Sequence, residues 1–336
     1  MRRHRRPSRA LIIVLGVASF ALCVAAGAQA LTDDPGAIWT LQGENASLST
    51  GKVTDRFYTN GVRLGWISPI GGGPAALQNL GHGLLGDVQQ RFSMDVSQQI
   101  YTPIATRLRL PVPTDRPYAG VLMANFGLLA DTANRRTQLG LGVGVIGPSA
   151  LGMQTQNGFH GVIGQGSNLG WARQIGNEPL LQFTASRTWR LPLGTIGGLE
   201  IDALPNLSVG VGNLRLYGQG GVTMRLGRGL NADFGVARLL PGLSGGDAYL
   251  PTDFAWYVFF GANGQAVGRD ITLDGNDFVA GASVRRLPLL AEAQAGFAVM
   301  AWGMRLSYTH VVQTQQFQHQ HGGLHQLGSL ALSARF

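Results

Sequence analysis

The chain has 336 residues and a formal net charge of +8, but five of its arginines lie within the first nine residues, and the rest of the chain carries a net charge of only +3. Because no further run of Lys and Arg follows, the composition argues against a nucleic-acid-binding protein. Glycine, at 50 residues, is about twice its usual ~7% share, and charged residues, at 13%, are about half their usual ~25%. No stretch after residue 30 offers 18 uninterrupted apolar residues, which argues against membrane-spanning helices.

The first thirty residues have the three parts of a secretory signal peptide. A basic head precedes the apolar run 10–26, and an A-x-A cleavage motif ends at Ala30. A retained membrane helix is the alternative, but the run is short and ends in small residues. Cys23, the only cysteine, does not follow a small residue, which argues against a lipoprotein. We therefore expect residues 1–30 to be removed and residues 31–336 to form one exported domain without disulfides.

Apolar residues alternate with small or polar residues along most of the remaining chain, which predicts β-strands. The alternation is most regular in 139–145, where Leu or Val alternates with Gly. In 58–66 the residues predicted to face lipid are Tyr58, Val62, Leu64 and Trp66. Those predicted to face inward are Thr59, Gly61, Arg63 and Gly65. Each segment is about as long as a tilted membrane strand, ~9–11 residues.

Similar segments cover the chain up to an alternating stretch that ends in the aromatic residue Phe336, as is typical of barrels assembled in the outer membrane. Tryptophans near strand ends, as at Trp39, Trp66, Trp189 and Trp302, fit an aromatic girdle. A soluble β-sandwich also gives short alternating strands and is the alternative. We predict an all-β fold, a transmembrane antiparallel β-barrel of about twelve strands. Thirteen candidate segments could supply these strands: 37–49, 58–66, 92–97, 118–129, 139–145, 181–189, 199–211, 215–226, 254–263, 275–286, 291–302, 304–312 and 330–336.

One long connection, 147–164, loses the alternation and is long enough for a short helix. Gln156 and His160 are four residues apart, so they would share one face of that helix. Four glycines weaken the helix, which therefore needs the barrel wall to pack against. A histidine can act as a general base toward water, although an isolated histidine is more often structural or exposed. The histidines His319, His321 and His325 suggest a metal site, but the Gln and Gly residues around them favour a flexible polar loop.

Ordered blocks along the chain resemble the lipid A 3′-O-deacylase family of outer-membrane barrels. They span nearly the whole mature chain in order, which makes a chance agreement improbable. The blocks begin with Glu44-Asn45 and Thr54-Asp55-Arg56-Phe57-Tyr58-Thr59-Asn60-Gly61-Val62-Arg63-Leu64, followed by Gln99-Ile100-Tyr101-Thr102-Pro103 and Thr114-Asp115-Arg116-Pro117-Tyr118-Ala119-Gly120. The later ones are Gly144-Val145-Ile146-Gly147-Pro148, Gln156-Asn157 with His160, Leu273-Asp274-Gly275-Asn276 and Arg305-Leu306-Ser307-Tyr308-Thr309-His310.

The resemblance implies a twelve-stranded monomeric barrel in the outer membrane that hydrolyses the 3′-linked acyl ester of lipopolysaccharide. It places the site between the inner wall and a short helix and implies calcium as cofactor, which polarises the ester carbonyl. Carried over to this sequence, His160 would activate water and Gln156 would be its helical neighbour. Asn45 and Thr59 would line the same site. The resemblance does not say which residues bind the metal.

One departure from the family pattern concerns the carboxylate expected directly after Asn45. The chain has Ala46 there, which can neither bind calcium nor orient an imidazole, so activity would need a substitute: Glu44, Asp55 or Asp95. A regular strand would also turn Asn45 outward, and only a β-bulge would turn it inward. A catalytically inactive structural or lipopolysaccharide-binding barrel is therefore the alternative function, and a small channel is a third.

Three arginines lie in or beside the loop before the segment 118–129. They are Arg107, Arg109 and Arg116. Because the guanidinium group binds phosphate oxygens bidentately, we expect these side chains to bind the glucosamine phosphates of lipid A.

Overall fold

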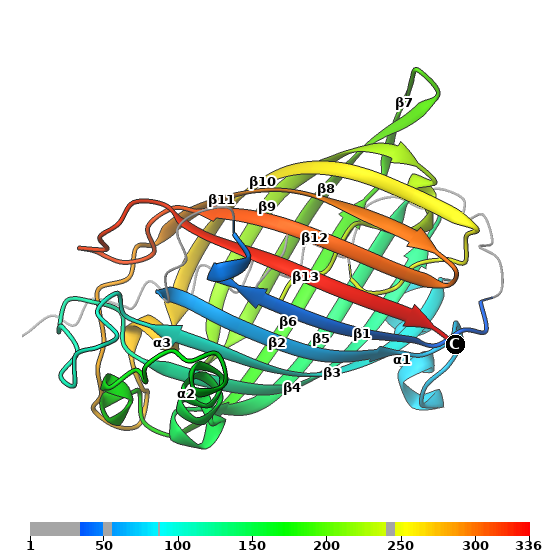
Figure 1. Cartoon of the computed structure of the whole chain (residues 1–336). Coiled ribbons are helices and arrows are strands. Elements are labelled where there is room, and N and C mark those ends of the chain that lie inside the picture. Colours follow the sequence, from blue (N-terminus) through cyan, green and yellow to red (C-terminus); the bar gives the residue numbers. More distant parts are fainter. Residues whose placement is uncertain (1–33, 50–55, 87, 240–245) are drawn as a thin grey trace, which may run out of the picture.

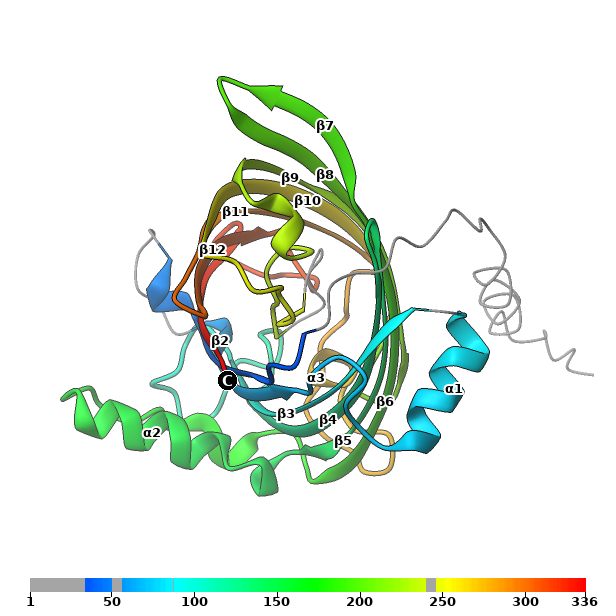
Figure 2. The ribbon, with the colours of Figure 1, turned by 90° about the vertical axis from the view of Figure 1, so that its right-hand side faces the viewer.

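The computed structural model describes residues 34–49, 56–86, 88–239 and 246–336, and it has one long β-sheet that closes into a barrel (Figures 1 and 2). The predicted signal peptide lies outside the described residues. The strands are β1 (Ile38–Asn45), β2 (Phe57–Ile67), β3 (Gln89–Thr102), β4 (Ala119–Thr132), β5 (Arg135–Ile146), β6 (Glu178–Trp189), β7 (Leu191–Ile196), β8 (Leu199–Gly212), β9 (Arg215–Arg228), β10 (Phe254–Asp270), β11 (Leu289–Ala301), β12 (Met304–Gln313) and β13 (His325–Arg335).

Every neighbouring pair of strands is antiparallel, and two pairings close the barrel. β1 pairs with β13, and β6 pairs with β8, so that β7 extends beyond the wall as a hairpin with β8. Twelve strands therefore make the barrel. Leu41, Leu64 and Val96 are exposed on its outer face, whereas Gln42 and Glu44 are buried on its inner face. The predicted all-β, twelve-stranded antiparallel barrel is confirmed.

Two details of the predicted strands are wrong. The segment 275–286 is a connection that follows the short helix α3 (Ile271–Asp274), and only Arg286 forms an isolated bridge, to Phe317. β7 was not predicted, because its sequence Leu-Pro-Leu-Gly-Thr-Ile contains Pro and Gly, which usually mark a turn.

The two ends of the barrel differ in the length of their connections. At one end, the turns β4–β5 and β11–β12 contain only two residues each, and the C-terminus lies there together with helix α1 (Ala75–Leu85) (Figure 1). At the other end most connections are long, and one of them contains helix α2 (Gly152–Val162). Barrels of this kind have short periplasmic turns and long extracellular loops. We therefore assign the α2 end to the cell surface and the α1 end to the periplasm.

Two described parts of the periplasmic connection between β9 and β10, residues 229–239 and 246–253, lie inside the barrel (Figure 2). Ion pairs bind both parts to the wall. Asp233 of this segment accepts hydrogen bonds from Arg225 (2.6 Å), Arg305 (3.1 Å) and Tyr257 (2.8 Å). Asp247 binds both terminal nitrogens of Arg63, at 2.6 and 2.8 Å. These charges are almost completely buried, so each depends on its partner inside the lumen. In the described part of the chain, no helix is long and apolar enough to cross a bilayer.

Candidate active site

Helix α2 lies outside the barrel, against the outer face of β3 and β4 (Figure 2). Its first residue, Gly152, is packed on Gly120 of β4, and a Cβ on Gly152 would lie 3.0 Å from the Gly120 Cα. Gly120 is on the same face as the lipid-facing residues Ala124 and Phe126, because alternate residues of a strand share a face. The predicted place between the inner wall and the helix is therefore wrong, since the packing face of α2 meets the outer wall.

Gln156 and His160 share the buried face of α2, as their spacing predicted. The Gln156 Oε1 accepts a 2.9 Å hydrogen bond from the indole of Trp171, which lies in a short 3-10 helix, Gly170–Arg173. The His160 Nδ1 lies 3.2 Å from the Gly166 carbonyl oxygen. A proton on Nδ1 donated to this carbonyl leaves Nε2 as the basic nitrogen of the ring.

Three aromatic and apolar side chains connect α2 to the wall. The rings of Trp171 and Tyr118 have their centroids 4.9 Å apart, and both pack with Ile100 of β3 in one buried cluster. The same Trp171 ring lies 2.9 Å from the place where a Cβ of Gly152 would be. This packing fixes the helix despite its low intrinsic helix propensity.

Asn45 lies at the extracellular end of β1 and faces outward. β1 pairs with β2 without a bulge, so Asn45 remains on the face of Trp39 and Leu41. It lies opposite Asn60, and the Asn45 Nδ2 donates a 3.1 Å hydrogen bond to the Asn60 Oδ1. Helix α2, which contains His160, also lies outside the barrel. Asn45 and α2 are therefore on the same, outer side of the wall.

A row of paired residues connects Asn45 with the start of α2. Asn45 lies opposite Asn60, Asn60 opposite Ile100, and Ile100 opposite Gly120. With strands ~4.8 Å apart, the row is roughly 14 Å long, about the length of an eleven-residue helix. Gly152, the first residue of α2, packs on Gly120 at one end of this row, and α2 contacts both β4 and β3.

The inward direction predicted for Thr59 is wrong because β2 has a β-bulge. Tyr58 lies opposite Tyr101 and Asn60 opposite Ile100, so Thr59 is the extra residue. Its hydroxyl lies 2.6 Å from that of Thr102, which shares the outer face with Ile100. The bulge also turns Tyr58 inward, where its hydroxyl donates to Glu44. The predicted lipid-facing direction of Tyr58 is therefore wrong as well.

Of the three carboxylates that could substitute for the one missing at position 46, the two that the structure describes do not lie on this wall. Glu44 and Asp95 face the lumen, where Glu44 accepts hydrogen bonds from Tyr58 and Gln42, and Asp95 accepts one from Asn125. Asp55 lies outside the described residues. Within the described ranges there is no group of three or more His, Cys, Asp and Glu residues that could hold a metal ion.

The described polar side chains near Asn45 on the outer face of the wall offer a calcium ion no carboxylate. Calcium takes six to eight oxygens, usually with carboxylates among them. Here Asn45, Asn60, Thr59 and Thr102 supply only amide and hydroxyl oxygens, and the Asn45 Oδ1 already accepts from the Ser47 backbone N–H. These residues do not by themselves fit a calcium ion.

The three predicted phosphate-binding arginines are in different environments. Arg107 and Arg109 are exposed, and the Arg107 Nη1 donates to the Ser167 carbonyl at 3.1 Å, next to the segment that contacts His160. Arg116 is buried, lies over the Tyr101 ring and donates hydrogen bonds to Gln316 and Thr272. Only Arg107 and Arg109 are therefore accessible at the surface.

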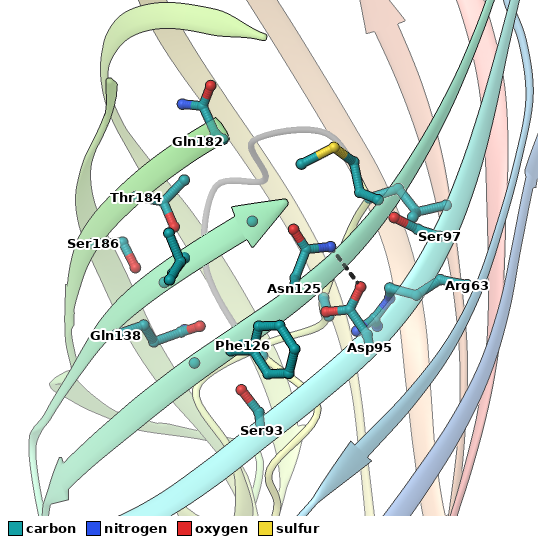
Figure 3. A pocket seen from close by; sticks show the side chains of 18 of the residues that line it. Arg63, Ser93, Asp95, Ser97, Asn125, Phe126, Gln138, Gln182, Thr184 and Ser186 are labelled. Carbon is teal, nitrogen blue, oxygen red and sulfur yellow. Dashed lines mark hydrogen bonds between the residues drawn. The ribbon is translucent and has the colours of Figure 1, made fainter. Parts of the chain in front are cut away.

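A separate polar cavity of about 330 Å³ lies inside the barrel and includes Asp95, Asn125, Gln182 and Thr184 (Figure 3). His160 and Gln156 do not line it. The cavity contains the ordinary polar lining of a barrel lumen and lies on the other side of the wall from α2.

The sequence prediction missed Trp171, Tyr118 and Asn60 as parts of the site. An aromatic residue in a glycine-rich connection is a signal that could have indicated Trp171 as an anchor of α2. Asn60 and Tyr118 stood within the family-like blocks but lack a chemical signature of their own. Of the predicted histidine cluster, His325 is buried beside Tyr58, whereas His319 and His321 are exposed.

Comparisons with known proteins agree with this architecture. A family model described as outer membrane protein LpxR matches residues 13–336. LpxR from Salmonella typhimurium is a similar solved structure, with a TM-score of 0.74 and 23% identity over 89% of this chain and 100% of that chain. The β domain of the Bordetella autotransporter BrkA is less similar, with a TM-score of 0.41 and 9% identity over 91% of this chain and 100% of that chain. No curated protein sequence matches the chain. The match over nearly the whole length confirms the predicted family and outer-membrane location: the chain belongs to the LpxR family of outer membrane proteins.

Proposed function

We propose that this protein is an outer-membrane lipid A deacylase that hydrolyses the 3′-linked acyl ester of lipopolysaccharide. The observation that carries the proposal is the position of His160, buried between α2 and the outer wall at the cell-surface end of the barrel. A base in this position faces the outer leaflet, where lipid A is embedded. A soluble substrate inside the lumen would be separated from His160 by the wall.

In the proposed reaction His160 acts as a general base. Its Nε2 takes a proton from a water molecule, and the oxygen of that water attacks the ester carbonyl carbon. The bond between this carbon and the sugar-side oxygen then breaks, and the imidazolium returns the proton to the leaving oxygen. The products are a free fatty acid and a sugar hydroxyl, so one water is consumed for each ester.

The neighbouring residues have positioning roles in this proposal. Asn45 and Thr59 provide the amide and hydroxyl groups that hold the ester and its developing oxyanion. Gln156 fixes the face of α2 through its hydrogen bond with Trp171. Calcium remains a prediction of the family resemblance, and we assign no step to it. A fall in activity with chelator and its recovery with added calcium would support this cofactor.

Arg107 and Arg109 are proposed to bind the lipid A phosphates. We expect the double variant Arg107→Ala/Arg109→Ala to raise KM more than it lowers kcat, because the arginines bind substrate away from the reacting atoms. Steady-state hydrolysis of purified lipid A in detergent measures both constants. A lower kcat at unchanged KM would contradict the phosphate role.

The experiment that tests the function is mass spectrometry of lipid A from a Gram-negative host that expresses the wild-type chain. Loss of the 3′-linked acyl group supports the deacylase. An unchanged lipid A, with the folded barrel present in the outer membrane, would instead support the alternative of a catalytically inactive barrel, which Ala46 favours.

Ala46→Asp restores the carboxylate of the family pattern and is expected to increase acyl release by about tenfold or more, equivalent to roughly 1.4 kcal/mol in the barrier. The matched control is Ala46→Asn, which has the same size without the charge. Acyl release is measured per amount of folded barrel, since Ala46 is buried and a larger side chain perturbs its surroundings. Equal rates in wild type and Ala46→Asp would show that this chain does not need the carboxylate.

The packing of α2 gives a further test. We expect Gly152→Val to lower acyl release by about tenfold or more, because its side chain collides with Trp171 and Gly120 and displaces the helix, and catalysis depends on position at the ångström scale. Gly158→Val is the control in the same helix, since a Cβ there meets nothing within 4 Å. Similar activity in the two variants would contradict the placement of α2 as a requirement.

A further inference from the structure

Helix α1 lies outside the barrel at the periplasmic end, between β2 and β3 in the sequence (Figures 1 and 2). It packs against the outer face of β4. Gly81 is its buried residue, and a Cβ there would meet Gln90 of β3 and Leu128 of β4. The helix therefore rests on the side of the wall that faces the membrane.

The exposed surface of α1 has one apolar and one polar flank. Leu80 and Leu84, one helical turn apart, are 54% and 61% exposed. The exposed residues Asn79 and His82 form the polar flank, on the opposite side of the helix face that Gly81 packs against the wall. No Asp, Glu, Lys or Arg occurs within α1, and the nearest charged residue in the sequence is Asp87, after the end of the helix.

The contacts of α1 lie close to the level of the aromatic girdle. Trp66 is opposite Met94, and Leu128 is opposite Phe92, only two residues nearer the periplasmic end of β3. All tryptophans at this end lie within two residues of a strand terminus, where such side chains mark the membrane interface. They are Trp39, Trp66, Trp189, Trp256 and Trp302. The apolar flank of α1 therefore continues the lipid-facing surface of the barrel at its lower edge.

We propose that α1 is an interfacial helix that inserts Leu80 and Leu84 among the phospholipid acyl chains of the periplasmic leaflet, with Asn79 and His82 in water. A helix with one apolar flank and no net charge binds a membrane through its apolar area. Continuity with the lipid-facing band favours phospholipid as the occupant over a second copy of the chain or a periplasmic protein.

Single cysteines test this placement, because Cys23 is the only native cysteine and precedes the predicted mature chain. Leu84→Cys and His82→Cys are labelled with a nitroxide in the full mature barrel, reconstituted in phosphatidylethanolamine and phosphatidylglycerol vesicles. Val96→Cys, on the exposed outer face of β3, is the lipid reference. Collision rates with oxygen, which partitions into lipid, and with a water-soluble nickel chelate are measured for each label. Heat-modifiable gel migration confirms that each variant is folded.

The proposal expects the ratio of oxygen to nickel collisions at Leu84 to shift to that of Val96, while the ratio at His82 stays that of a label in water. Equal, water-like ratios at Leu84 and His82 would overturn it, because the helix would then stand away from the membrane. Low collision rates with both reagents at Leu84 would also overturn it, because the flank would then be covered by protein.

Discussion

Replacement of His160 by alanine is expected to lower acyl release from lipid A by about 10²–10⁴-fold, the usual contribution of a general base. The imidazole is the proton acceptor in the proposed reaction, and the methyl group of alanine cannot accept a proton in its place. The rate is measured by mass spectrometry of lipid A treated with purified barrel for a series of times.

Two variants distinguish a catalytic from a structural histidine. His160→Gln keeps a polar side chain of similar length and is expected to be as inactive as alanine, since an amide cannot take a proton from water. His321→Ala, in an exposed loop, is expected to leave the rate unchanged. If His160→Gln retained most of the activity, His160 would serve only to pack α2, and the proposed mechanism would be wrong.

The barrel was predictable from the sequence because lipid on one side and a polar lumen on the other select every second residue. Leu141 and Val143 are exposed and Gly142 is buried, as the alternation of 139–145 indicated. The phase of β2 was not predictable at its extracellular end. The bulge at Thr59 depends on pairing with β3, about forty residues later, and the local sequence does not encode that pairing.

The shared helical face of Gln156 and His160 was predictable from the sequence, but the side of the wall that this face meets was not. Gln156 and His160 share a face because helical spacing is local. That this face meets the outside of the barrel depends on Gly120, Gly152 and Trp171, which are distant in sequence or carry no chemical signal. A regular β1 strand turns Asn45 outward, which conflicted with a site on the inner wall. The same direction agrees with a site on the outer wall.

The ion pairs of Asp233 and Asp247, which bind the connection between β9 and β10 inside the barrel, are expected to dominate the stability of the barrel. Asp233→Ala should lower the free energy of unfolding by about 3–5 kcal/mol, because it leaves buried Arg225 and Arg305 each without one carboxylate partner. Urea unfolding in phospholipid vesicles, followed by tryptophan fluorescence, measures the change. The control is Asp277→Ala. The Asp277 side chain forms a 2.5 Å ion pair with Arg269, and the two side chains are 31% and 28% exposed. Loss of this exposed pair should lower the free energy of unfolding by less than ~1 kcal/mol.

The pH dependence gives the same prediction a second readout. Burial alone would raise the pKa of Asp233, but Arg225 and Arg305 outweigh it and hold the pKa below its usual value. The stabilisation is therefore complete at pH values above the unfolded pKa of about 3.9 and is lost as the pH falls through the lower folded pKa. The stability difference between wild type and Asp233→Asn should accordingly persist from neutral pH to about 4 and shrink only below it. A difference that already vanished at pH 6 would mean that the inserted segment is held by packing rather than by these charges.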